Sequence, residues 1–456
     1  MHLLHHDHGF HSARRRIPSR RGGMSTWLIL GLTLLLALLA LAIDGANLWQ
    51  ARVELRNSSD AMVLATAQAL LDDEILTNKP NVMRQVVERS HAEAVAYGQA
   101  NPVLGRPQEL IFTPDDPEQS DLVFGYKEDP AVRGFTPAYD LNDQHLNTVR
   151  VIARRTRERG NPAGMYFGRF LSLPFADVVA SATAYLDRDV IGFRPIGNVP
   201  VPLAPLALLT DPTMSDSEAW ETQTIKPTLS PTPGGADDFV FDRASKRFLE
   251  VGVDAEQGDG LYEMNVYIPL EGQPNFEQDR DDANGCFLFD GELGPNGETN
   301  WQPIARQFRT GVTRDDLVKL DGQIVLGSDN RLILPGLPSA PSLQSQDLNV
   351  LLDGLEALEA SGDPRVWPIY SLVEQDPRSP MRWRTTVQGF VAARLARVEV
   401  IQVGEAGAQQ RQMLRLTLQP CMMAVHSAVT DFSRRHANPE FDIYNRYICK
   451  VRLVNE

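Results

Sequence analysis

Residues 24–43 read MSTWLILGLTLLLALLALAI, which is twenty consecutive positions without a charged side chain. An α-helix of this length spans about 30 Å, which matches the hydrocarbon core of a bilayer. A helix in a soluble core keeps a polar stripe, but this one would be apolar all round. We therefore expect a retained transmembrane helix. A cleaved export signal is the alternative, because Ala40, Ala42 and Ala46 would supply small residues for cleavage, although its apolar region is usually shorter.

The charges around this segment predict its orientation. Residues 1–23 carry five arginines and one aspartate, a net charge of +4, and because the whole chain carries −15, the remainder carries −19. Positively charged flanks stay in the cytoplasm, so we expect a cytoplasmic N-terminus and an exported body on the outer side of the inner, cytoplasmic membrane. A body this acidic repels nucleic acid and anionic lipid, so we exclude both as partners of the main body.

The helix is expected to continue beyond the membrane. Residues 45–71 contain no proline, and alanine recurs through them. Small side chains let a second helix approach closely, although alanine is also simply a good helix former. Apolar residues at helical spacing predict a further amphipathic helix over 81–100, so that 44–100 would form an exported helical stalk.

A specific series of residues flanks the apolar span. Arg20, Arg21 and Gly22 precede it, and Asp44 and Gly45 follow it. The series continues through Asn47, Leu48, Trp49, Arg52, Leu55, Asn57, Asp60 and Ala61. This order resembles the N-terminal segment of TadG-like proteins of the Tad (Flp) pilus-assembly apparatus, and the resemblance covers residues 20–72.

Later segments add to the resemblance. NTVRVIARR (147–155) and FGRFLSLPFADVVASATAYL (167–186) resemble two paired strands of the exported part of these proteins. VQGFVAARLARVEV (387–400) and NRYICKVRLV (445–454) resemble planctomycete-type members. One departure is that Leu28 stands where prepilin-type substrates carry glutamate, so we do not expect processing by a prepilin peptidase.

The resemblance implies a function without catalysis. It implies a single-pass component of pilus assembly or secretion, whose partners are the cytoplasmic membrane and other pilus-assembly proteins. We expect it to act by helix packing and by partner binding outside the membrane. The residues predicted to do so are Asp44, Trp49, Arg52, Asn57, Asp60, Ala61 and Ala65.

A metal-dependent adhesive module is the first alternative. Many TadG-like proteins carry a von Willebrand A domain, and its metal motif is matched most nearly by Asp211, Thr213 and Ser215. Carboxylate and hydroxyl oxygens at this spacing suit a divalent cation, but Pro212 favours a loop. The acidic run Asp279, Asp281 and Asp282 lacks the spacing of a calcium-binding loop and predicts a solvated loop.

The sequence nominates no catalytic residue. It contains no GxSxG, HExxH, P-loop or GxGxxG motif. Five of the nine histidines lie in the first eleven residues, which we interpret as a basic, histidine-rich cytoplasmic tail. We therefore predict no cofactor and no small-molecule substrate. An exported hydrolase is the least favoured alternative, because it needs titratable side chains that converge in a pocket.

The rest of the chain predicts an α+β fold, in which the membrane helix leads into a strand-rich mixed region. We expect an α+β region at 101–194, a proline-rich linker at 195–236 and a strand-rich domain at 237–456. Within them, two-residue alternation predicts strands over 149–155, 177–186, 414–419 and 447–453. QIVLGSDNRLIL (323–334) predicts a hairpin, and residues 348–361 predict a helix.

Cysteine usage leaves two alternatives open. The chain has Cys286, Cys421 and Cys449, and no two of them are spaced for a zinc site. The alternation around Cys449 places it on an inward face. Cys421 and Cys449 would form a disulfide if their strands are neighbours, or else remain buried thiols.

Overall fold

The structure is a computed structural model of the 456-residue chain. It describes residues 23–77, 79–114, 116–142, 145–210, 220, 224, 236–270, 284–288, 300–337, 345–377, 379–403, 411–434 and 444–454. The chain divides into two compact units. Unit 1 comprises 1–55 and 154–179, and unit 2 comprises 56–153 and 180–456. Unit 1 thus combines the N-terminal helical segment with a later arm of the chain.

Helix α1 is a single unbroken element, Gly23–Ala69, of 47 residues. Its apolar window is wholly exposed, and among the described residues it is the one helix long and apolar enough to cross a membrane. A core helix of a soluble protein would instead bury such a window. The helix runs on beyond Ile43 as predicted. Apolar burial begins at Ala51 and Leu55, and within unit 2 the helix buries Met62, Val63 and Ala67.

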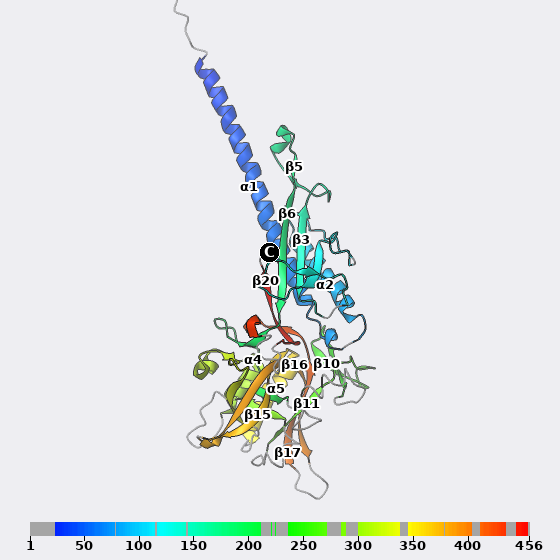
Figure 1. Cartoon of the computed structure of the whole chain (residues 1–456), viewed down its shortest axis with the longest axis vertical. Coiled ribbons are helices and arrows are strands. Elements are labelled where there is room, and N and C mark those ends of the chain that lie inside the picture. The colour runs from blue at the N-terminus through cyan, green and yellow to red at the C-terminus, as the bar shows by residue number, and fades with distance from the viewer. Residues whose placement is uncertain are drawn as a thin grey trace, which may run out of the picture. The chain divides into compact units, whose positions relative to one another are not determined.

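The second segment of unit 1 is an arm formed by residues 154–179. It contains the end of β3, a short hairpin, a 3₁₀ turn and the start of β6. The hairpin strands and the turn are β4 (Ala163–Gly164), β5 (Phe175–Ala176) and η2 (Gly168–Leu171). Ala163 pairs with Ala176 in antiparallel register, and in Figure 1 this arm rises beside α1.

Unit 2 contains a six-stranded sheet. The last two residues of β3 and the first two of β6 belong to unit 1. The order of this sheet is β18 (Met423–Ala424), β20 (Ile448–Val454), β6 (Val178–Asp187), β3 (Thr148–Arg155), β1 (Leu122–Tyr126) and β2 (Thr136–Pro137). It confirms the strands predicted over 149–155 and 177–186. Helix α2 (Val82–Ala100) confirms the predicted amphipathic helix and buries Val86, Val87 and Ala94.

A seven-stranded sheet forms the core of the C-terminal part of unit 2. Its order is β11 (Met264–Pro269), β17 (Arg411–Pro420), β16 (Ser379–Val403), β14 (Leu332–Leu337), β12 (Gly285–Leu288), β8 (Leu206–Leu209) and β15 (Arg365–Asp376). Strand β15 also pairs with β16, so β16, β14, β12, β8 and β15 close into a ring. This closure leaves β15 without an open edge, which protects it from pairing with other chains.

Two helices accompany this sheet, α4 (Trp301–Thr310) and α5 (Ser345–Ser361), and α5 confirms the helix predicted over 348–361. Figure 1 shows α4, α5, β15, β16 and β17 gathered in one part of unit 2. Phe287 meets Trp301 edge to face with ring centroids 5.2 Å apart. The fully buried Trp367 donates its indole N–H to the carbonyl oxygen of Ala393 at 3.1 Å, so its polar atom is satisfied inside the core.

Smaller elements complete the described part of the chain. A three-stranded sheet has the order β13 (Ile324–Val325), β7 (Val190–Phe193) and β19 (Ala428–Thr430). A separate hairpin joins β9 (Phe239–Asp242) and β10 (Arg247–Glu250). Three further 3₁₀ turns are η1 (Asp73–Thr77), η4 (Asp315–Leu320) and η5 (Phe432–Arg434).

The hairpin predicted over 323–334 is wrong. A turn does form, because the Gly327 N–H donates to the Arg331 carbonyl oxygen at 2.8 Å. The flanking strands then diverge, because β13 pairs with β7 whereas β14 pairs with β12 and β16. Turn chemistry is local, but the choice of strand partner depends on distant segments.

The segment predicted as a linker contains a core strand. Strand β8 lies in the middle of 195–236, and all four of its residues are buried. It pairs antiparallel with β12 and parallel with β15. The pairings of the seven-stranded sheet are otherwise antiparallel. This differs from the doubly wound parallel sheet that the von Willebrand A alternative requires.

The alternation predicted near the C-terminus is correct only in part. In β17, Leu414, Leu416 and Leu418 are fully buried as expected, but Gln419 of the opposite face is buried too. In β20, Cys449 is buried, whereas Leu453 is half exposed. Side chains on both faces of β17 are therefore buried near its C-terminal end, whereas the side chains of β20 become more exposed toward its C-terminal end.

Candidate functional site

The contact between α1 and the arm in unit 1 is organised around Asp44, the first residue after the uncharged span. Its side chain is buried, with a relative exposure of 3%. One carboxylate oxygen accepts from the Tyr166 N–H at 2.7 Å, and the other accepts from the Gly168 N–H at 2.6 Å. The Phe167 N–H lies 3.1 Å from both oxygens. Three successive backbone donors thus form a nest for this carboxylate, which we call the Asp44 clasp.

Two local features hold the arm in the position that the Asp44 clasp requires. A Cβ atom at Gly168 would lie 2.4 Å from the Leu173 carbonyl oxygen, so only glycine fits where the loop closes so tightly. The Asn47 side-chain amide, one turn along α1, donates to the Gly164 carbonyl oxygen at 2.8 Å. The arm is therefore held to α1 at two consecutive turns of the helix.

The other residues predicted to bind partners lie along α1. Trp49, Arg52 and Asn57 are exposed, and Asp60, Ala61 and Ala65 are partly buried. The structure does not bring all of them to one place. Asp60 lines a surface pocket of about 240 Å³ in unit 2, together with residues of β6 and β20.

Ala65 instead lines a larger open groove of about 500 Å³ between the end of α1 and α2. Its apolar lining is Ala65, Ala69, Leu71 and Ala92, and its polar lining is Gln68, Asp72, Arg89, Glu93, Tyr97 and Arg243. We call this surface the α1–α2 groove. Its lining therefore combines small side chains with charges of both signs.

A pair of aspartates directly after α1 joins several segments of unit 2. Asp72 accepts from Arg243 at 2.5 Å and lies 2.9 Å from Arg89. Burial opposes its ionisation, but the hydrogen bonds and positive charges around it outweigh burial and lower the pKa of Asp72. Asp73 accepts from Arg394 of β16 and from the Met422 backbone N–H, both at 2.6 Å.

This network was not identified from the sequence, although both aspartates directly follow an alanine-rich helix. Its partners come from positions 89, 243, 394 and 422, and no spacing rule connects them. Arg394 also lies over the Phe241 ring, 4.3 Å from its centroid. The segment that leaves α1 is therefore fixed to α2, to the β9–β10 turn and to β16.

A buried carboxyl cluster lies in unit 2, at the residues before β11 and at the end of β17. The Gln419 side-chain amide donates to Glu263 at 3.0 Å and lies 3.3 Å from Asp259. Burial, together with the charges of Asp237 and Asp259, raises the pKa of Glu263 to about 8. Burial likewise raises the pKa of Asp259 to about 6.

Lys79 lies beside this cluster without neutralising it. Its ammonium donates to the Asp259 backbone carbonyl oxygen at 2.5 Å rather than to a carboxylate. A retained proton therefore substitutes for a counter-ion at Glu263 at neutral pH. Among the described residues, no group of three histidine, cysteine, aspartate or glutamate side chains is arranged to hold a metal ion.

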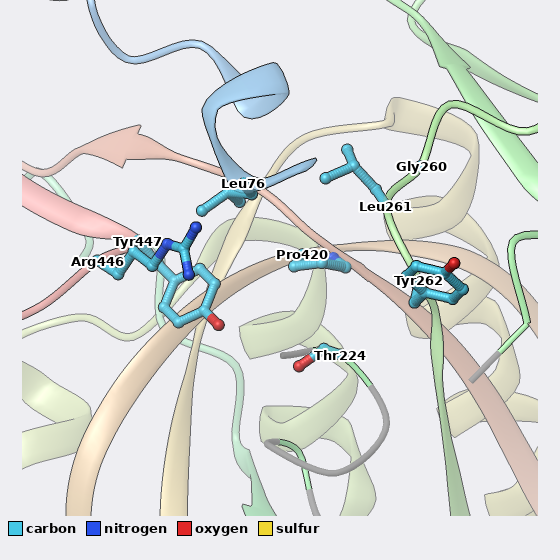
Figure 2. A pocket seen from close by; sticks show the side chains of 8 residues that line it. All are labelled: Leu76, Thr224, Gly260, Leu261, Tyr262, Pro420, Arg446 and Tyr447. Carbon is cyan, nitrogen blue, oxygen red and sulfur yellow. The ribbon is translucent and has the colours of Figure 1, made fainter. Parts of the chain in front are cut away.

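The cavity in Figure 2 is too small for a substrate. Its volume is about 10 Å³, which is room for roughly one water molecule. Leu76, Leu261 and Pro420 line it together with the polar groups of Thr224 and Tyr447. It is a packing void between segments of unit 2 rather than a binding site.

Several residues singled out from the sequence fall elsewhere. Asp211, Thr213 and Ser215 lie outside the described residues, and so do Asp279, Asp281, Asp282 and the histidine-rich tail. Cys421 and Cys449 are free, buried thiols, so the disulfide alternative is wrong and the buried-thiol alternative is confirmed. Burial raises the pKa of each thiol to about 12, which keeps both protonated and unreactive.

The aspartate network generates a stability prediction. Asp73→Ala should destabilise unit 2 by about 3–5 kcal/mol, because it leaves the buried Arg394 guanidinium without its carboxylate. The measurement is chemical unfolding of the detergent-solubilised chain. Glu250→Ala is the control, because its pair with Arg397 is about one-third exposed and should contribute at most about 1 kcal/mol. Equal losses in the two variants would contradict the prediction.

The carboxyl cluster generates a pH prediction. Folded Glu263 keeps its proton up to about pH 8, whereas its ordinary pKa is 4.5, so between these values the folded chain binds more protons than the unfolded chain. Stability should therefore fall as pH rises from 5 to 8, by on the order of 1 kcal/mol per pH unit. Glu263→Gln should flatten this dependence in urea unfolding. Glu256→Gln, at an exposed position, should leave the slope unchanged, and a wild-type slope in the Glu263 variant would disprove the assignment.

Comparisons with known proteins do not identify a relative of this chain. No family model, no curated protein and no solved structure matches it. Its function must therefore be inferred from its own residues and their geometry.

Proposed function

We propose that this chain is a non-enzymatic, single-pass component of a Tad (Flp)-type pilus-assembly or secretion apparatus in the bacterial cell envelope. Its N-terminus would lie in the cytoplasm, α1 would cross the inner membrane, and the body would stand outside. The observation that carries the proposal is α1 itself, whose apolar window is fully exposed in the folded chain. The resemblance over residues 20–72 supports the assembly role.

The edge of the span supports the anchoring part of the proposal. Asp44 is a charged residue at the end of a lipid-compatible helix, and an unpaired carboxylate at that depth would be costly. The Asp44 clasp removes this cost by directing three backbone N–H groups at the carboxylate. The arginines that precede the span favour the cytoplasmic side for the N-terminus.

The end of α1 supports the partner-binding part. Ala65 and Ala69 lie in the α1–α2 groove, where small side chains leave room for another helix. Arg89 and Glu93 stand at the same groove and would select a partner by complementary charge. The aspartate network fixes the helix end behind this surface, so a load on a bound partner would pass into the body of unit 2.

Membrane topology tests the anchoring part. A reporter enzyme that is active only outside the cytoplasm should be active when fused after Glu456 and inactive when fused before Met1. In fractionation, the full-length chain should remain in the membrane fraction and should require detergent for release. Recovery of the full-length chain in the soluble fraction without detergent would refute the anchor.

The groove tests the partner-binding part. The double substitution of Ala65→Leu and Ala69→Leu should fill the α1–α2 groove and reduce recovery of assembly partners in a membrane pull-down by about tenfold or more, because a partner helix could no longer approach closely. Leucine is a good helix former, so the helix itself should survive. Ala100→Leu, at an exposed position outside the groove, is the matched control. Undiminished recovery with the double variant would exclude helix packing at this surface.

A further inference from the structure

The loop 165–175 presents a cluster of apolar side chains to solvent. It reads MYFGRFLSLPF, and its most exposed large side chains are Phe170 at 79%, Leu171 at 72%, Tyr166 at 60% and Leu173 at 59%. The loop contains no acidic residue, and Arg169 is its one charge. We call it the arm tip. An exposed apolar cluster of this kind marks an interaction surface.

The arm tip is a built structure rather than an unfolded segment. The Met165 N–H donates to the Pro174 carbonyl oxygen at 2.9 Å, and the Leu173 N–H donates to the Gly168 carbonyl oxygen at 2.9 Å. Between these bonds, η2 turns the chain and Ser172 closes the turn in the left-handed region, with φ of 59°. The backbone thus holds the apolar side chains outward without help from a partner.

The position of the arm tip along α1 identifies what covers it. Asp44 follows Ile43 directly, and its carboxylate binds the N–H groups of Tyr166, Phe167 and Gly168. The arm tip is therefore tied to the turn of α1 at which the uncharged span ends. A bilayer that surrounds residues 24–43 has its outer interface at this level.

The composition of the arm tip also suits this interface. Aromatic side chains concentrate at the boundary between headgroups and acyl chains, and the tip offers Tyr166, Phe167 and Phe170. Arg169 has a long apolar stem, so its guanidinium would reach the headgroup level while the stem lies along the apolar side chains. A neighbouring protein would also cover apolar groups, but only the bilayer is already present at the residue that holds the loop.

We propose that the arm tip inserts its aromatic and leucine side chains into the outer leaflet beside α1, as a second membrane contact of this chain. The inference rests on the proposed transmembrane role of α1. A single helix can rotate and tilt in a bilayer, whereas a helix with a second attachment at its outer end is restricted in both motions. The Asp44 clasp is the joint between the two contacts.

Depth-dependent quenching tests this proposal on the full chain in lipid nanodiscs. Leu171→Cys is labelled with an environment-sensitive fluorophore, and the three native cysteines should stay unlabelled because they are buried. Lipids brominated near the headgroup end of the acyl chain should quench the label about twofold or more, because the label would sit at that depth. Glu158→Cys, in a polar turn of the same unit, should not be quenched. Leu35→Cys lies about 12 Å deeper than Ile43, so lipids brominated near the acyl-chain terminus should quench it, and it reports the span itself.

The outcomes separate this proposal from the proposed anchor. Quenching at Leu35→Cys without quenching at Leu171→Cys would overturn the membrane contact of the arm tip and leave the anchor intact. Quenching at neither position would overturn both. A blue shift at Leu171→Cys without lipid quenching would show that a protein surface covers the tip, which also overturns the proposal.

The clasp provides a second measurement. Asp44→Ala should release the arm tip and reduce the quenching of the Leu171→Cys label by about half or more, while the Leu35→Cys signal stays unchanged, because alanine offers no acceptor to the three backbone donors. Asp44→Asn retains one acceptor oxygen and should give an intermediate value. Undiminished quenching in Asp44→Ala would show that the clasp does not hold the arm tip at the bilayer.

Discussion

The first half of α1 exposes an apolar surface on all sides, and this is the constraint that the rest of the structure has to meet. Of the twenty successive side chains without charge, all but the partly covered Ala40 stand exposed in the folded protein, and none is buried. Burying them would require a core that surrounds a helix on all sides, and neither unit supplies one around this part of α1. The backbone of a helix is satisfied internally, so a hydrocarbon environment suits this segment without further partners.

The carboxylate of Asp44, directly after this segment, explains why the arm 154–179 lies against α1. A buried carboxylate needs donors, and the side chains of α1 next to Asp44 are mostly apolar or small. The donors come instead from backbone N–H groups more than 120 residues later in the chain. Gly168 is the residue that lets this later loop close tightly enough to present them.

The other end of α1 is fixed by charge pairs, and these are of two kinds. Asp73 and Arg394 are both largely buried, so each depends on the other, whereas Arg89 and Arg243 reach Asp72 from the surface. The carboxyl cluster at Glu263 follows the opposite principle. There, burial without a counter-ion favours the neutral acid, so a retained proton takes the place that guanidinium groups hold at Asp72 and Asp73.

The sequence alone determined the features that depend on local composition and period. These are the apolar span, its continuation to Ala69, α2, α5, and strands β3, β6 and β17. Tertiary structure decided the features that depend on contacts between distant segments. The partners of β13 and β14, the burial of Gln419, the core position of β8 and the donors at Asp44 all depend on contacts between residues far apart in the chain. Helix period and hydrophobicity are properties of a short window, whereas pairing and burial depend on which surfaces finally meet.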